Sequence, residues 1–450
     1  MLIFDVNTGT ITDYSYSGRK DVIIPRTIKG VEVKAIGEYA FYYKGLNSVK
    51  IPDTVTEIGD LAFNSNNLGV VTIPNSVVKI GDGAFKEAGL TKVVLPENIK
   101  DIGKGVFKNN SLTEFTIPKN MEVIPESLLE NNELVKIVIP DGVKEVGKKA
   151  FYNNNLTEAE FADSVKKIDS MAFVNNKLES VELPNDCDVH ILAFDENVKT
   201  NIPKKPEKEV SDEKDFAFDK ETGTITEYLS DDPIVKIPST IDGVAVKRIG
   251  NFEDYIGIKK FKVGAFEGKE ILQLTIPEGV EEILEGAFKN NSLKTLNLPQ
   301  SLKVLEKDAF SDNKIKSVNI PKEIKEISEG VFRNNELEEV TMAKDVKSIG
   351  AEAFMNNNLK TIDIPDGLTT IEANSFASNN LTEVLLPESV TSIEIGAFIG
   401  NPIEKINLPE NLEKIGDGAF KYTRLTELTV PEKVKEASRC NDKCTCKSLN

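Results

Sequence analysis

The residues best able to do chemistry are few and far apart in the sequence. The run from Gly142 to Lys148 matches the G-x-x-x-x-G-K pattern of a phosphate-binding loop, but Lys149 follows where a magnesium-binding Ser or Thr is needed. The chain's one histidine, His190, lies near Cys187, and a zinc site needs more ligands at close spacing. We therefore interpret these patterns as a repeat turn and a surface histidine in a slipped turn.

Two further motifs could hold a metal ion. The segment Asp5-Val6-Asn7-Thr8-Gly9 resembles the start of a calcium loop, but it lacks the later acidic ligands and favours a hairpin turn. Near the C-terminus lie Cys440, Cys444 and Cys446. These three thiols could bind a metal ion together with a ligand from outside the tail. Alternatively, two of them form a disulfide, the whole tail stays reduced, or one forms an intermolecular disulfide. We expect no catalytic residue, no cofactor and no metal site, and hence no enzyme.

Composition limits the partners of the chain. Its 450 residues include 73 acids and 55 bases, and the net charge of -18 disfavours nucleic acid and anionic membranes. No apolar run approaches the ~18 residues of a membrane span, so membrane insertion is not expected. Met1–Asp5 is too short an apolar start for a signal peptide, which predicts an intracellular protein or a mature or trimmed chain.

The elements that position these residues follow from an internal repeat of 22 residues. Prolines that follow an apolar residue recur with this spacing, with Ala162 and Ala343 standing in the same column; they are Pro52, Pro74, Pro96, Pro118, Pro140, Pro184, Pro277, Pro299, Pro321, Pro365, Pro387, Pro409 and Pro431. A column of phenylalanines keeps the same period; it includes Phe63, Phe85, Phe107, Phe151, Phe173, Phe288, Phe310, Phe332, Phe354, Phe376, Phe398 and Phe420. A first series of seven units starts with the unit at Leu46, and a second series of eight starts with the unit at Ile271. The chain therefore holds two tandem arrays.

Each part of the unit predicts a structure. The alternation in Phe115-Thr116-Ile117 is typical of a short strand, and Pro118 ends its ladder because proline has no N–H. The segment Gly81–Phe85 has room for one helical turn, whose Phe fills the interior. Because one unit cannot bury its apolar face alone, the units must stack, with the strands in a parallel sheet. This pattern predicts an α/β solenoid.

An asparagine column lies three residues after the phenylalanine position. Its members are Asn66, Asn110, Asn132, Asn154, Asn176, Asn197, Asn291, Asn313, Asn335, Asn357, Asn379 and Asn401. We expect side-chain amides that cap backbone groups at the bend between units. A row of glycosylated asparagines is the alternative, because Asn109, Asn155, Asn290 and Asn380 open N-x-Ser/Thr sequons.

A larger duplication defines the domains. The run Thr8-Gly9-Thr10-Ile11-Thr12 returns at residues 222–226, and both copies are interpreted as β-hairpins that cap an array. The charged, proline-bearing stretch between the arrays has a linker composition. We predict a cap and first array over 1–197, a linker over 198–213, a second cap and array over 214–436, and a Cys-bearing tail over 437–450.

These motifs carry a family resemblance. The pattern L-x-x-V-x-I-P-x-x-V-x-x-I-G-x-x-A-F-x-x-N resembles the Treponema-type leucine-rich repeat of the BspA-like surface-protein family, over nearly all of residues 1–431. The resemblance implies a right-handed solenoid with parallel strands on the concave face and short helical turns on the other. It also implies protein contact, often at a microbial surface, so a cell-surface or secreted location is expected although the chain shows no signal peptide or anchor. It brings no catalytic residues.

The predicted binding surface consists of strand positions that point away from the core. Its candidate residues are Val94, Glu114, Val138, Glu158, Glu160 and Glu182 in the first array, and Asn297, Asn319, Asp363 and Leu385 in the second. The outward apolar residues interrupt a polar column and are candidate anchors, whereas Glu158, Glu160 and Glu182 favour a basic partner. A solvated, β-favouring surface with no partner is the alternative.

Two functions remain open on the sequence. The first is an adhesin-like interaction module that binds a host or microbial surface protein through the strand face, and that is expected to be a monomer. The second is a passive spacer or an intracellular scaffold. The sequence does not name the ligand.

Overall fold

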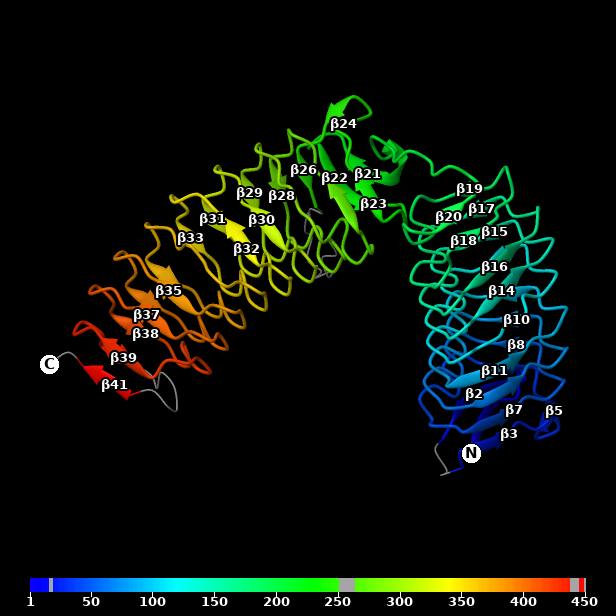
Figure 1. Cartoon of the computed structure of the whole chain (residues 1–450). Coiled ribbons are helices and arrows are strands. Elements are labelled where there is room, and N and C mark those ends of the chain that lie inside the picture. Colours follow the sequence, from blue (N-terminus) through cyan, green and yellow to red (C-terminus); the bar gives the residue numbers. More distant parts are fainter. Residues whose placement is uncertain (16–18, 251–263, 438–444, 449–450) are drawn as a thin grey trace. The chain divides into compact units, whose positions relative to one another are not determined.

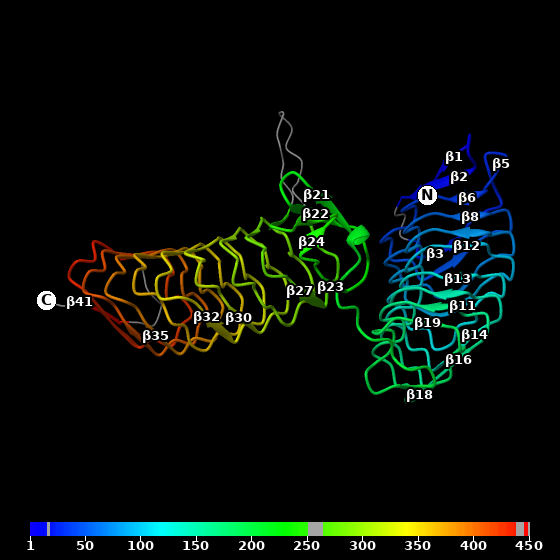
Figure 2. The same ribbon diagram turned by 90° about the horizontal axis from the view of Figure 1, so that it is seen from above.

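The structure is a computed structural model that describes residues 1–15, 19–250, 264–437 and 445–448 of the chain. The chain divides into two compact units, Met1–Glu207 (unit one) and Lys208–Asn450 (unit two). Figures 1 and 2 show that the strands of each unit are stacked one behind another in chain order. The division falls inside the segment 198–213 that the sequence suggested as a linker.

Most repeats contribute two strands, which stack into two separate ladders, each divided into shorter sheets. The strand before the proline forms the long-strand ladder, and a strand of two residues later in the unit forms the short-strand ladder. Neighbouring turns pair in parallel, as in Lys136↔Glu158 and Glu145↔Lys167. The parallel solenoid predicted from the repeat is confirmed.

The strands of unit one alternate between these ladders. The short-strand ladder and its cap comprise β1 (Leu2–Asp5), β2 (Thr10–Tyr14), β6 (Ala35–Ile36), β8 (Glu57–Ile58), β10 (Lys79–Ile80), β12 (Asp101–Ile102), β13 (Val123–Ile124), β15 (Glu145–Val146), β17 (Lys167–Ile168) and β19 (Asp188–Val189). The long-strand ladder comprises β3 (Asp21–Ile23), β7 (Ser48–Lys50), β9 (Gly69–Thr72), β11 (Leu90–Val94), β14 (Lys136–Ile139), β16 (Glu158–Phe161), β18 (Ser180–Val181) and β20 (Lys199–Thr200). A small hairpin joins β4 (Thr27–Ile28) to β5 (Val31–Glu32).

Unit two repeats the plan. Its short-strand ladder and cap comprise β21 (Phe216–Asp219), β22 (Thr224–Tyr228), β26 (Arg248–Ile249), β28 (Glu282–Ile283), β29 (Val304–Leu305), β31 (Glu326–Ile327), β33 (Ser348–Ile349), β34 (Thr370–Ile371), β36 (Ser392–Ile393), β38 (Lys414–Ile415) and β40 (Glu436–Ala437). Its long-strand ladder comprises β23 (Ile234–Lys236), β27 (Gln273–Thr275), β30 (Ser317–Asn319), β32 (Glu339–Thr341), β35 (Glu383–Leu385), β37 (Lys405–Asn407), β39 (Glu427–Val430) and β41 (Thr445–Ser448). A small hairpin pairs β24 (Thr240–Ile241) with β25 (Val244–Ala245), and one 3₁₀ turn, η1 (Glu213–Asp215), precedes the cap.

The predicted hairpin caps are present at the first turn of both units. Strands β1 and β2 are antiparallel, and β2 then pairs in parallel with β6, which joins the hairpin to the stack. Strands β21 and β22 do the same with β26. Tyr14 of β2 lies on the first core ring, Phe41, at 5.5 Å between ring centroids, so the cap also closes the end of the core.

The helical turn expected in each unit is not confirmed, because no residue that the structure describes is α-helical. The segment around the Phe column forms tight turns that contain a residue with positive φ, such as Lys149 at 56°. Alternate N–H groups bond to the next turn of the solenoid, as in Phe151 N–H to Ala172 O at 2.8 Å, while those between them close local turns, as in Tyr152 N–H to Lys149 O at 3.1 Å. Because every second donor bonds to the neighbouring turn, the continuous internal hydrogen bonds of a helix do not form.

The Phe column forms a stack of rings inside each unit. In unit two the rings from Phe266 to Phe420 follow one another with centroids 4.8 to 6.1 Å apart, and Phe288, Phe310 and Phe332 are fully buried. The offset, nearly parallel rings add to the burial of their apolar surface. In unit one the stack is interrupted at Leu129, which takes the Phe place in one unit.

The asparagine column caps backbone groups as predicted. The Oδ1 of Asn132 accepts the N–H of Leu112 at 3.1 Å, and its Nδ2 donates to Phe107 O at 2.9 Å and Leu129 O at 3.2 Å. The same contacts recur at Asn154, Asn291, Asn313, Asn335, Asn357 and Asn379. Asn197 is an exception, because it is exposed in a turn where the 22-residue spacing has slipped.

The segment between the arrays is held at both of its ends. Strand β20 pairs with β18, and at the other end Ser211 N–H donates to Lys236 O at 2.9 Å. Residues 203–210 between these points are all exposed. These exposed residues lie within the predicted linker 198–213.

The predicted tail over 437–450 lies largely outside the described residues, including Cys440 and Cys444. Strand β41 is described, and its backbone pairs in parallel with β39, with Cys446 opposite Leu428. The solenoid thus continues for two strands, β40 and β41, beyond the last proline of the repeat, Pro431.

Candidate protein-binding surface

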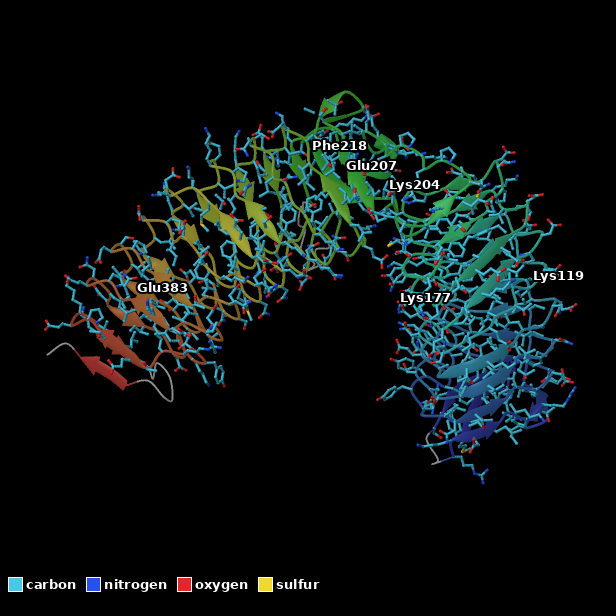
Figure 3. The ribbon with its side chains drawn as sticks, in the orientation of Figure 1. Lys119, Lys177, Lys204, Glu207, Phe218 and Glu383 are labelled. Carbon is cyan, nitrogen blue, oxygen red and sulfur yellow. The ribbon has the colours of Figure 1, made fainter. Side chains whose placement is uncertain are left out.

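All ten candidate residues are exposed at long-strand positions of the two units. The alternation of the strand explains this arrangement, because successive side chains point to opposite faces and the inward ones fill the core. Val94 and Val138 are apolar and yet 45% and 46% exposed. Leu385, at the end of β35, is 66% exposed, and the neighbouring Glu383 marks this strand in Figure 3.

The structure brings three of the candidates together. Val94, Glu114 and Val138 line one surface groove of about 720 Å³ on the long-strand ladder of unit one. The groove runs from the level of Lys92 to the turns that follow the strands, and its other lining residues include Val93, Leu95, Pro96, Phe115, Pro118 and Pro140. Its volume is within the roughly 300–1,000 Å³ of ligand-binding clefts.

The groove lies at a break in the long-strand ladder. Strand β11 pairs with β9 and β14 pairs with β16, but the segment 112–117 between them is not assigned to a strand. No backbone–backbone hydrogen bond joins residues 113–117 to either neighbour. The main-chain groups of this extended segment are thus left to water.

An exchange of side chains marks the same unit. Phe115 occupies a strand column that otherwise holds smaller residues such as Val71, Val93 and Ile137, while Leu129 replaces the core ring. The Phe115 ring packs on Phe107, with centroids 5.5 Å apart and ring planes tilted by 54°. The larger ring therefore contributes to the lining of the groove.

The core is partly open along the groove. Val93, Leu95 and Phe115 are half-buried, whereas the equivalent Val71 and Ile137 are only 1% exposed. The groove therefore has an apolar floor as well as the apolar rim formed by Val94 and Val138.

Ion pairs surround the groove. Lys92 Nζ lies 2.7 Å from Glu114 Oε1, and this hydrogen bond lowers the pKa of Glu114. Lys136 contacts both Glu160 and Glu158, and its hydrogen bonds to these carboxylates raise the pKa of the ammonium. Glu158 and Glu160 are therefore less available to a basic partner than the sequence suggested.

The other candidates do not form part of this site. Glu182 follows β18 further along unit one. Asn297, Asn319, Asp363 and Leu385 belong to separate turns of unit two.

The sequence analysis missed two exposed aliphatic residues on the same ladder. Ile23 of β3 is 75% exposed and Val70 of β9 is 57% exposed. Ile23 pairs with Lys50, so it belongs to the column of Val94, but it was counted with the cap. Val70 lies in the column of Lys92, whose other members include the charged residues Glu114 and Lys136.

The sequence motifs for other chemistry have structural roles in the described part of the chain. The segment Gly142–Lys148 forms a turn and β15 and opens no helix. Asp5 accepts the N–H of Asn7 at 2.9 Å and the hydroxyl of Thr8 at 3.0 Å, which closes the β1–β2 hairpin and lowers the pKa of Asp5.

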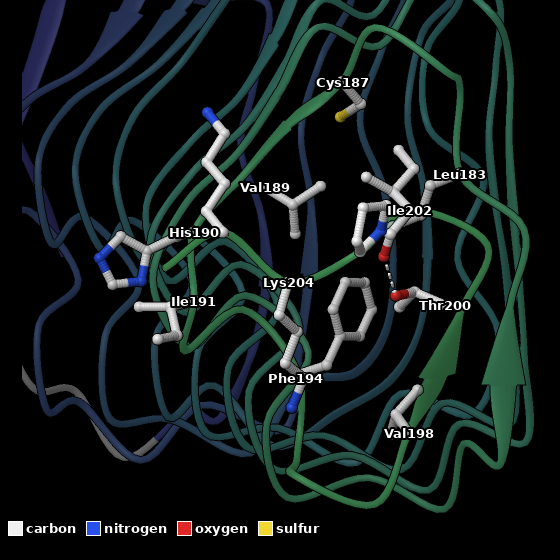
Figure 4. Close-up of a pocket in the computed structure, with 12 residues that line it drawn as sticks. Leu183, Cys187, Val189, His190, Ile191, Phe194, Val198, Thr200, Ile202 and Lys204 are labelled. Carbon is white, nitrogen blue, oxygen red and sulfur yellow. Dashed lines mark hydrogen bonds between the residues drawn. The ribbon is translucent and has the colours of Figure 1, made fainter. Parts of the chain in front are cut away.

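Cys187 and His190 line a small pocket at the end of unit one (Figure 4). Its volume of about 30 Å³ has room for about one water molecule. The His190 ring lies apart from the Cys187 sulfur, and its Nδ1 accepts the N–H of Leu192 at 3.1 Å. Burial raises the pKa of the Cys187 thiol to about 11. Among the described residues, no three His, Cys, Asp or Glu side chains are grouped to hold a metal ion.

Comparison with known proteins gives one family match. The model described as "BspA type Leucine rich repeat region (6 copies)" matches residues 9–135, 124–239, 259–379 and 326–447. No curated protein matches the chain.

Several solved structures are similar to the chain. A leucine-rich-repeat protein from Bacteroides ovatus is 20% identical with a TM-score of 0.30, over 100% of this chain and 98% of that protein. A leucine-rich cell-surface protein from Faecalibacterium prausnitzii is 21% identical with a TM-score of 0.31, over 100% and 93%. The pneumococcal vaccine antigen PcpA is 16% identical with a TM-score of 0.26, over 90% and 86%.

Proposed function

The chain belongs to the BspA-type leucine-rich-repeat family, and we propose that it is a non-catalytic, adhesin-like module that binds a protein partner on its long-strand face. Leucine-rich-repeat proteins are in general protein-interaction modules. The partner is a host or microbial surface protein, and the module acts as a monomer at the cell surface or as a secreted protein. The location is inferred from the family.

One observation carries this proposal. The groove in unit one combines an apolar floor with two exposed valines, Val94 and Val138, on an otherwise polar strand face. Apolar residues that become buried at the centre of an interface, inside a polar rim, supply most of the binding free energy of protein complexes. The ion pairs of Lys92 and Lys136 form such a rim.

The charge of the surface favours a partner that is not strongly acidic overall, because the chain carries a net charge of -18. Close to the groove the charges are mixed, so the approach is salt-sensitive while the final contact depends on apolar burial. In the described residues no helix has the length and apolar character to cross a bilayer.

A passive spacer or intracellular scaffold is the second candidate. The long-strand face outside the groove supports it, since Asn297, Asn319 and Asp363 are exposed and polar. A spacer needs no apolar residue for binding a partner, and its surface residues tolerate substitution without loss of function.

Capture by the immobilised full-length chain tests the proposal. Surface proteins extracted from host cells and from microbial cells are passed over it, and each retained protein is identified, purified and titrated to obtain its Kd. Val94→Lys and Val138→Lys are each expected to weaken that Kd by about tenfold or more, because each places a charge where an apolar anchor is buried.

Two matched variants are the controls. Leu385→Lys changes an exposed aliphatic residue on the long-strand ladder of unit two, and Lys104→Glu changes an exposed charge in a tight turn of unit one. Neither should change the Kd by more than about twofold. Equal effects of all four variants, or no saturable binding by any purified protein, would favour the spacer.

A further inference from the structure

We infer that the groove of unit one binds an extended segment of its partner, with aliphatic side chains on the groove floor and an acidic residue near Lys119. This inference rests on the proposed function and specifies what the partner must present there. It depends on the backbone of residues 112–117, on the shape of the groove and on the charges around it.

The backbone of residues 113–117 is extended and makes no backbone–backbone hydrogen bond. The assigned long strands of unit one each have one paired neighbour, as Val138 has in Glu160 of the β14–β16 pair. Exposed main-chain donors and acceptors in an extended chain are the groups that an added strand uses, since main-chain bonds give affinity regardless of sequence. A folded, convex partner surface offers few such groups.

The shape of the groove fits such a segment. It follows the strand from Lys92 to Pro96, and at ~3.3 Å per residue this run accommodates about five extended residues. In an extended chain alternate side chains point the same way, so every second residue of the segment reaches Val93, Leu95 and Phe115.

A second unpaired segment shows that loss of pairing alone does not make a groove. Residues 359–364 of unit two also lie outside any strand, between β32 and β35. There the inward residues Ile362 and Ile364 remain buried, at 9% exposed. The groove of unit one differs from this segment in the Phe115 ring that lines it, because Ile362 holds the equivalent position in unit two.

The charged residues around the groove favour an acidic residue at one end of the bound segment. The lysines that line the groove are Lys92, Lys119 and Lys136, and the acids are Glu97 and Glu114. Lys92 and Lys136 are in ion pairs with glutamates, whereas Lys119 is exposed and makes no ion pair with a described residue (Figure 3). An acidic side chain beside Lys119 therefore meets a cation in a protein that is otherwise strongly acidic.

A random linear hexapeptide library displayed on phage is the probe. It is selected against the full-length chain, and the most enriched peptide is synthesised and titrated by fluorescence anisotropy. We expect enriched peptides with aliphatic residues at alternate positions and an acidic residue at one end. Lys119→Glu should raise the Kd of the synthetic peptide by about fivefold or more.

The double variant Phe115→Val with Leu129→Phe removes the aromatic ring that lines the groove while keeping the core filled. It restores the residue types that the neighbouring units have at these columns, so it is expected to fold. Peptide affinity should fall at least tenfold, whereas Leu385→Lys should leave it unchanged. Hydrogen exchange gives a second measurement, since the amides of residues 113–117 should exchange faster than those of β14 in the free parent chain and slow down when the peptide is bound.

The outcomes separate this inference from the proposed function. If a purified protein partner binds through Val94 and Val138 but no hexapeptide is enriched, the extended-segment inference is wrong and the interaction module stands. Peptide binding that is equal in the parent and the double variant also overturns the inference. If neither peptides nor proteins bind, both proposals fail.

Discussion

Replacing Asn154 by alanine removes one member of the buried amide column and nothing else. The side chain is 7% exposed; its three shortest hydrogen bonds join backbone groups of two successive turns, and a fourth, at 3.4 Å, goes to Tyr152 O. Its Oδ1 accepts the N–H of Leu134 at 3.1 Å, and its Nδ2 donates to Leu129 O at 2.9 Å and to Phe151 O at 3.2 Å.

The substitution does not affect the hydrogen bonding of these three backbone groups equally. Leu129 O still accepts from Asn132 at 3.2 Å, and Phe151 O still accepts from Asn176 at 3.0 Å. The Leu134 N–H has no other acceptor in the structure, so it becomes an unsatisfied buried donor, which costs about 1–3 kcal/mol. With smaller losses at the two carbonyls, unit one should be destabilised by about 2–4 kcal/mol.

The assay is chemical denaturation followed by far-UV circular dichroism, because the chain contains no tryptophan. The two units are expected to unfold separately, so the transition of unit one is compared between variants. Hydrogen exchange adds a local measurement. If local opening controls exchange, a loss of about 2–4 kcal/mol should speed exchange at the Leu134 amide by roughly 30-fold or more.

Asn197→Ala is the matched control, because the sequence places Asn197 in the same column but its side chain is exposed. Its effect should stay within about 0.5 kcal/mol. Equal denaturation midpoints and equal exchange for the two variants would refute the view that the amide column stabilises the bends.

Three further predictions concern the core, the connection and the buried thiol. Phe107→Ala should destabilise unit one by about 3–5 kcal/mol, measured by the same denaturation, because the ring is fully buried; an unchanged midpoint would contradict the stacked core. Limited trypsin digestion should cut first after Lys204 or Lys208, in the exposed run 203–210, and leave two folded halves in mass spectrometry; first cleavage inside either stack would contradict this. With Cys440, Cys444 and Cys446 replaced by serine, iodoacetamide should label Cys187 slowly at pH 8 in the folded chain and rapidly in urea, because its pKa is raised to about 11. Since folding favours the protonated thiol, its contribution to stability is complete below the unfolded pKa of about 9 and decreases as the pH rises towards 11. Cys187→Ala should therefore lessen the alkaline loss of stability.

The repeat fold was predictable because each column is sampled many times. A single buried phenylalanine or asparagine predicts little about the fold. Phe107 and Asn132, however, belong to columns in which the same residue type recurs at the same spacing through both arrays. Burial of the rings and bonding of the amides then follow from the stacking that every unit requires.

The turn opposite the strands was not predictable from local sequence. Nothing in Gly147–Phe151 forbids a helical turn. What decides the structure is that the Phe151 N–H bonds to Ala172 in the next turn, and that Lys149 adopts positive φ. Both depend on contacts between units rather than on propensity.

The groove was only partly visible in the sequence. Alternation identified Val94 and Val138 as outward-facing, and their exposure agrees with that prediction. The exchange of Phe115 and Leu129 appears in the sequence as two departures from the columns. The strand segment without partners in the same unit becomes visible only once the side chains are packed between neighbouring turns.

The register of the ladders has a consequence for how such a chain can change in length. Within the stacks, many short strands pair with the strand 22 residues later, as Lys79 does with Asp101 and Ser392 with Lys414. Shorter spacings occur at the last turns, where Glu427 pairs with Thr445 and Ser180 with Lys199. Near the start of unit two the spacing is longer, since Arg248 pairs with Glu282, and yet the Tyr228 and Phe266 rings still stack with centroids 5.2 Å apart. Length inside a stack can therefore change by a whole turn or by a loop that leaves the stack between two strands, because either change keeps the later rings and amides on their columns.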